Sequence, residues 1–110
     1  MIDLNLVVLV GRIRGGIKRY TDGPGKVVFT VFRSGSAFYV EGVGPYRIRE
    51  ASELVDGSRV LVVGALFSRK KRGGKDQVGV RAEQIVPLDG IGEVEPILRM
   101  VRACLSVCER

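Results

Sequence analysis

The strongest constraint on the fold is a pair of apolar segments, residues 60–66 and 78–86, that flank a short basic segment. Both apolar segments are rich in β-branched residues, which favour strands over helices. Gly73 and Gly74 lie between them and permit a tight turn. The pattern predicts a β-hairpin with a cationic tip, which we call the basic finger. Its basic residues are Arg69, Lys70, Lys71, Arg72 and Lys75.

The first half of the chain shows three further strand patterns, at residues 4–13, 27–32 and 37–43. The last two are joined by a segment short enough for a hairpin, so we expect them to pair antiparallel. Residues 14–26 combine glycine and proline with basic side chains and are predicted to form a loop. Pro45 then begins a short helix, with Ile48, Ala51 and Val55 at helical spacing and Gly57 at its end.

The C-terminal segment has a different periodicity. After Pro87 the apolar residues recur every three or four positions, which indicates an amphipathic helix. We therefore expect a barrel domain at residues 1–90 and an assembly helix at residues 91–110. The apolar stripe is wider than one small barrel would cover, so it is predicted to contact other subunits. Its residues are Ile97, Met100, Val101, Cys104, Leu105 and Cys108.

The charge of the chain is strongly basic. Its 18 Lys and Arg exceed its 12 Asp and Glu, which gives a net charge of +6. Such a balance favours a polyanionic partner. Outside the finger, the basic residues expected to contact that partner are Arg12, Arg14, Lys18, Arg19 and Arg33.

The residues offer little for catalysis. There is no histidine, and we find no nucleophile–base pair, phosphate-binding loop or metal-ligand cluster. Cys104 and Cys108 are too few to hold a metal and are expected to pack as small apolar residues. We therefore predict a non-enzymatic protein without a metal or cofactor.

No segment approaches the ~20 apolar residues that cross a bilayer, and no basic region precedes the first apolar segment. We expect no membrane partner and an intracellular location, in the cytoplasm or nucleoid, or in the nucleus of a eukaryote. Arginine outnumbers lysine and the amide residues are few, a composition that fits a thermophile weakly and that a GC-rich genome would also produce in part.

Five strands with a helix between the third and fourth form the topology of the oligonucleotide/oligosaccharide-binding (OB) fold, a Greek-key barrel. Three segments carry a closer resemblance: LVVLVGRI at 6–13, GSRVLVVGAL at 57–66 and QIVPLDGIGEVEPILRMVRAC at 84–104. Together they resemble the central domain of the middle subunit of replication protein A. The first two segments are also similar to bacterial single-stranded-DNA-binding proteins. The resemblance implies single-stranded-DNA binding and a C-terminal helix that bundles with partner subunits.

Proteins that bind single strands stack bases on aromatic rings, and this chain has no Trp. The positions that match the family's stacking aromatics hold Phe38 and Tyr39 in the third strand and Phe67 at the end of the fourth. Alternation places Phe38 and Tyr39 on opposite faces, and we expect Tyr39 to face the ligand. Leu66 is expected to point inward and Phe67 outward. The other phenylalanines, Phe29 and Phe32, are expected in the core.

The leading hypothesis is a non-catalytic single-stranded-DNA-binding subunit of a replication protein A-like complex, acting in replication, recombination or repair as a homo- or hetero-oligomer. One alternative keeps the fold as a scaffold that joins proteins without binding nucleic acid. Another is an RNA-binding barrel, because the sequence does not show whether a 2′-hydroxyl is read.

Overall fold

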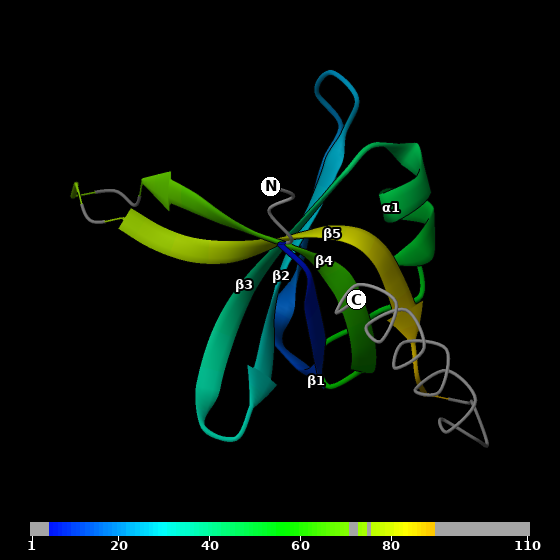
Figure 1. Cartoon of the computed structure of the whole chain (residues 1–110). Coiled ribbons are helices and arrows are strands. Elements are labelled where there is room, and N and C mark those ends of the chain that lie inside the picture. Colours follow the sequence, from blue (N-terminus) through cyan, green and yellow to red (C-terminus); the bar gives the residue numbers. More distant parts are fainter. Residues whose placement is uncertain (1–4, 71–72, 75, 90–110) are drawn as a thin grey trace, which may run out of the picture.

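The computed structural model of the 110-residue chain describes residues 5–70, 73–74 and 76–89. Five strands close into a barrel in the order β1-β2-β3-β5-β4 (Figure 1). Neighbouring strands are antiparallel except β3 and β5, which pair in parallel. The elements in chain order are β1 (Val7–Tyr20), β2 (Lys26–Arg33), β3 (Ser36–Val43), α1 (Pro45–Glu50), β4 (Arg59–Lys70) and β5 (Asp76–Pro87).

The first strand is longer than the sequence indicated. The predicted loop at residues 14–26 is wrong for most of its length, because β1 continues to Tyr20 and pairs with β2 up to Lys26. Gly15 and Gly16 interrupt the pairing as a bulge, with φ of +90° and +82°. Side chains other than glycine rarely adopt such values. The two glycines that suggested a loop therefore bend a continuous strand instead.

The two predicted hairpins are confirmed. Strands β2 and β3 pair in continuous register from Lys26↔Val43 to Arg33↔Ser36. Strands β4 and β5 pair beyond the barrel, as far as Lys70↔Asp76. Strand β3 pairs with β5 only at residues 79–81 of β5. The outer part of the β4–β5 hairpin therefore projects from the barrel as a two-stranded arm (Figure 1).

Helix α1 is shorter than predicted. It ends at Glu50, and Val55 is 64% exposed, so its assignment to the apolar face of the helix is wrong. The chain turns after the helix, where the Leu54 amide donates to the Ala51 carbonyl. This turn buries Ala51 and Leu54 in the core, and Ile48 packs against the core from the helix itself. The helix therefore covers the barrel with residues from its end as well as its face.

The core follows strand alternation. Val27, Phe29 and Val31 of β2 are buried, while the residues between them face outward. Two predictions for apolar side chains fail. Phe32 is only partly buried and lies on the outside of the barrel, where the side chain of Arg14 covers it. Leu66 is 49% exposed because it lies where the β4–β5 arm leaves the barrel.

The architecture confirms the expected fold class: a mainly β, closed five-stranded barrel with one helix between the third and fourth strands, the topology of the OB fold. The C-terminal helix and its apolar stripe, predicted at residues 91–110, lie outside the described residues. Within the described ranges, no helix has the length and apolar character of a membrane span. No cluster of His, Cys, Asp or Glu in those same ranges is arranged to hold a metal ion.

Candidate functional site

One row of side chains crosses all five strands on the outer face of the barrel. Each residue in the row is the Cα partner of the next: Arg14 of β1, Thr30 of β2, Tyr39 of β3, Gly79 of β5 and Phe67 of β4. Adjacent strands lie about 4.8 Å apart, so the row brings residues from distant parts of the sequence to one surface. We call this row and the outward residues that flank it on β1, β2, β3 and β5 the outer face.

An aromatic pair lies at one end of the row. The ring centroids of Tyr39 and Phe67 are 6.2 Å apart, with the ring planes tilted by 58°. Both side chains are partly buried, so each ring is held in place while part of it reaches solvent. The prediction that these two residues point outward agrees with this geometry, whereas their contact with each other was not predicted. Such a pair offers a fixed apolar surface for a planar ligand.

Gly79 lies between the two rings. A Cβ atom on this residue would lie 2.8 Å from Cδ1 of Tyr39 and 2.9 Å from Cε1 of Phe67, closer than carbon atoms approach without a shift. The glycine is buried although it faces outward, because the rings cover it. Absence of a side chain at this position therefore allows the rings of two non-adjacent strands to meet.

Arg81 is a member of the outer face that sequence reasoning missed. Its guanidinium lies over the ring of Phe67, 4.6 Å from the centroid, in cation–π geometry. It follows Gly79 by two residues in β5, so alternation places both on the same face. This spacing was the sequence signal that could have placed Arg81 on the outer face. Arg14 covers Phe32 in the same way, at 4.8 Å.

A hollow opens beside Tyr39, with a volume of about 260 Å³, which we call the arginine hollow. Arg14 and Lys18, both exposed, lie on either side of the β1 bulge. Gly15 and Gly16 contribute no side chains there, so the space between the two cations stays open. The lining residues are Arg14, Gly15, Gly16, Lys18, Val28, Phe29, Thr30 and Tyr39.

A second hollow, of about 570 Å³, lies near the β1–β2 turn, and we call it the tyrosine hollow. The ammonium group of Lys26 lies 5.1 Å from the ring centroid of Tyr20, and the carboxylate of Glu41 forms part of the wall. Tyr20 was missed because its segment was predicted to be a loop. The lining residues are Tyr20, Asp22, Pro24, Gly25, Lys26, Glu41 and Val43.

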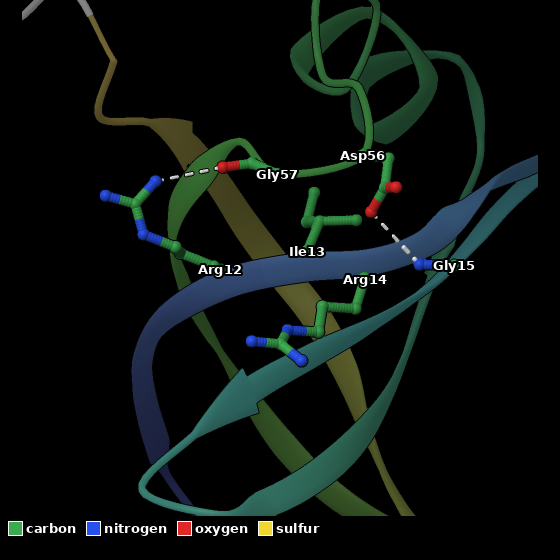
Figure 2. A pocket seen from close by; sticks show the side chains of 6 residues that line it. All are labelled: Arg12, Ile13, Arg14, Gly15, Asp56 and Gly57. Carbon is green, nitrogen blue, oxygen red and sulfur yellow. Dashed lines mark hydrogen bonds between the residues drawn. The ribbon is translucent and has the colours of Figure 1, made fainter.

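Arg12 occupies a different setting from Arg14. Its Nη1 donates to the Gly57 carbonyl at 3.0 Å, while the Gly15 amide donates to Oδ1 of Asp56 at 3.1 Å. Figure 2 shows these two bonds joining β1 to the segment that precedes β4, with the Arg14 side chain lying apart from both. The shallow hollow that they line holds a carboxylate as well as two guanidinium groups. Arg12 therefore fastens this segment to the barrel.

Two other predicted basic residues do not join the outer-face row. Nη2 of Arg19 donates to the Ala51 carbonyl at 2.9 Å, so this side chain reaches the end of α1. Nη1 of Arg33 donates to the Val10 carbonyl at 3.2 Å, at the end of β2 opposite the β1–β2 turn. In the basic finger, Arg69 and Lys70 belong to the end of β4. Lys71, Arg72 and Lys75 lie outside the described residues, as do the six stripe residues predicted for assembly.

The arrangement combines the two features that hold a single strand of nucleic acid. Aromatic rings stack on bases of any sequence, and cations follow the phosphates. On the outer face the rings of Tyr39 and Phe67 lie beside Arg14, Lys18 and Arg81. A single strand of nucleic acid that crosses the β-strands would contact the aromatic rings and then the cations.

No family model and no curated protein matches the sequence. Among solved structures, the Plasmodium falciparum SSB in complex with ssDNA superimposes with a TM-score of 0.69 at 18% identity, covering 81% of this chain and 98% of that one. The second single-stranded DNA binding protein (SSBb) of Mycobacterium smegmatis superimposes with a TM-score of 0.67 at 25% identity, covering 76% and 86%. This chain has the fold of those proteins. 

The two structural neighbours support only one of the two resemblances that the sequence suggested. Both are named as single-stranded-DNA-binding proteins, and the Mycobacterium smegmatis protein belongs to the bacterial group that the first two sequence segments resemble. The more specific likeness to the middle subunit of replication protein A depends largely on the C-terminal segment, which lies outside the described residues.

Proposed function

We propose that the chain is a non-catalytic protein that binds single-stranded DNA on the outer face of its barrel. The observation that carries this proposal is the cross-strand row, in which two aromatic rings meet over Gly79 beside exposed cations. Bases stack on Tyr39 and Phe67 while phosphates lie against Arg14 and Lys18. The likeness to proteins named for this activity supports the same function.

The basic finger extends this surface. The β4–β5 arm that carries it continues from Phe67, so Arg69 and Lys70 follow that ring along β4. Each phosphate contact releases counterions and makes binding depend on salt. The finger therefore adds affinity without adding base selectivity.

Binding of fluorescently labelled oligo-dT, measured by anisotropy at several salt concentrations, tests the proposal. We expect saturable binding that weakens steeply with salt, and weaker binding of a duplex of the same length, because paired bases cannot stack on the rings. Absence of binding to oligo-dT at low salt would contradict the proposal and favour the scaffold alternative.

An RNA strand of the same sequence is the necessary competitor. The outer face presents stacking rings and cations, which any single strand can engage, so we propose DNA on the strength of the structural neighbours. Equal or tighter binding of the RNA strand would favour the RNA-binding alternative instead.

We further propose that the chain acts as one subunit of a replication protein A-like oligomer in intracellular DNA metabolism, assembled through the predicted helix at residues 91–110. The apolar stripe of that segment supports this proposal. Replacement of Val101 and Leu105 by Asp should place unpaired charges in the seam and yield a monomer in light scattering. A wild-type chain that is already monomeric at high concentration, alone and with candidate subunits, would contradict it.

A further inference from the structure

The two hollows of the outer face differ in charge. Arg14 and Lys18 line the arginine hollow, and no carboxylate is among its lining residues in the part of the chain that the structure describes. The tyrosine hollow contains two carboxylates, Asp22 and Glu41, with Lys26. Phosphate groups are attracted to the first hollow and repelled from the carboxylates of the second. A strand that lies across this face therefore presents a base, rather than its backbone, to the tyrosine hollow.

Glu41 is the group that such a base meets. It lies two residues from Tyr39 on the same face of β3, and its Cα partners are Val28 of β2 and Arg81 of β5. The Tyr39 hydroxyl donates a long hydrogen bond, of 3.5 Å, to its Oε2 atom, so the carboxylate lies beside the aromatic pair. The side chain is partly exposed, so the lone pairs of its oxygens that the Tyr39 hydroxyl does not use can accept from a ligand.

The chemistry of a carboxylate decides which base it favours. An ionised Glu is an acceptor only, and its two oxygens match two parallel N–H donors. The Watson–Crick edge of guanine presents such a pair, N1–H and N2–H. Thymine presents one N–H between two acceptor oxygens, which the carboxylate repels. Cytosine and adenine each present one amino group beside an acceptor nitrogen.

We infer that Glu41 is a specificity-determining residue that selects guanine in the tyrosine hollow, with the base resting against Tyr20 and Val43, which lie on either side of Lys26. Tyr20 is 43% exposed and Val43 is 44% exposed, and both line the hollow with Glu41. The base stacks on apolar surface while its edge donates to the carboxylate. This inference rests on the proposed function, because it names the base that one part of the same surface prefers.

The test uses a labelled oligo-dT strand in which the central nucleotide is thymine, guanine or hypoxanthine. Hypoxanthine is guanine without the N2 amino group, so it offers one donor of the pair. We expect the wild-type chain to bind the guanine strand about tenfold more tightly than either of the others, the discrimination of one good bidentate contact. Affinities are compared at one salt concentration.

The Glu41→Gln variant should lose this preference, with the three affinities falling within about threefold of one another. Binding of plain oligo-dT should be equal or tighter, since a negative charge leaves the face. The matched control is Asp22→Asn, which removes the same charge from the rim of the same hollow and should keep the guanine preference.

Each outcome has a distinct meaning. A guanine preference that survives in Glu41→Gln, or is absent from the wild-type chain while all three strands bind, overturns the role of Glu41 and leaves the proposed function standing. If the wild-type chain binds none of the strands at low salt, the proposed function itself is wrong. The comparison of guanine with hypoxanthine needs no variant, so the inference is testable even if Glu41→Gln does not fold.

Discussion

The rings of Tyr39 and Phe67 meet at 6.2 Å although their strands do not pair, because β5 lies between β3 and β4 and has a glycine where the rings converge. The contact depends on the parallel pairing of β3 with β5 that closes the barrel. Closure of the sheet therefore creates the stacking surface, because it brings Tyr39 of the β2–β3 hairpin against Phe67 of the β4–β5 hairpin.

Removal of either ring should weaken single-strand binding. We expect Tyr39→Ala and Phe67→Ala each to lose ~1–3 kcal/mol of affinity for oligo-dT. The double variant should lose less than the sum, since the rings contact each other and one supports the other. Anisotropy titrations give the affinities. Tyr46→Ala is the control: this ring is 71% exposed on α1 and should leave the affinity unchanged.

Gly79→Ala should act on the same surface without removing a ring. The added Cβ forces Tyr39 and Phe67 apart, and we expect a loss of ~1–3 kcal/mol in oligo-dT affinity, comparable to the loss of one stacking ring. The neighbouring Val78→Ala, at a position that is 61% exposed, is the matched control and should bind normally. Unchanged affinity in Gly79→Ala would show that the ring spacing does not matter for binding.

Lys18 and Arg19 are adjacent in sequence but serve different purposes. Lys18 lines the arginine hollow, whereas Arg19 donates to the Ala51 carbonyl. Lys18→Ala should reduce the slope of log affinity against log salt by about one, for the loss of one phosphate contact. Arg19→Ala should leave the slope unchanged and lower the free energy of unfolding by ~1 kcal/mol, for the loss of one hydrogen bond. Equal slopes for the two variants would contradict this division.

Gly64→Ala should destabilise the fold. A Cβ at this position would collide with the carbonyl oxygen of Arg81, where the register of β4 and β5 shifts. Backbone cannot move aside as a side chain can, so we expect a loss of ~3 kcal/mol in the free energy of unfolding. Urea denaturation, monitored by circular dichroism, measures this free energy of unfolding. A variant as stable as the wild-type chain would show that the strands separate more easily there than the structure implies.

Alternation along the strands explains how much the sequence could reveal. Apolar segments rich in β-branched residues predicted the five strands, and alternation predicted the outward direction of Tyr39 and Phe67, because side chains along a strand point to opposite faces in turn. Phe32 lies three residues from Phe29, so alternation places it on the outer face, and its assignment to the core rested on apolar character alone. Its cover by Arg14 is a tertiary contact that no local pattern encodes.

Other features depended on contacts between distant segments. Tyr20 was assigned to a loop because Gly15 and Gly16 resemble loop residues until β2 is seen to pair beyond them. Leu54 replaces Val55 in the core because the helix ends early and the chain turns. Arg81 could have been placed on the outer face from its spacing to Gly79, but its position over Phe67 required the register of β4 and β5.

The most direct test of the central claim is a map of backbone amide chemical shifts during titration of the ¹⁵N-labelled chain with oligo-dT. If the outer face holds the strand, the largest changes fall on Thr30, Tyr39, Glu41, Gly79 and Arg81, while the amides of α1 change little. Changes concentrated on α1 and the segment before β4, with the amides of the outer-face row unmoved, would contradict the account.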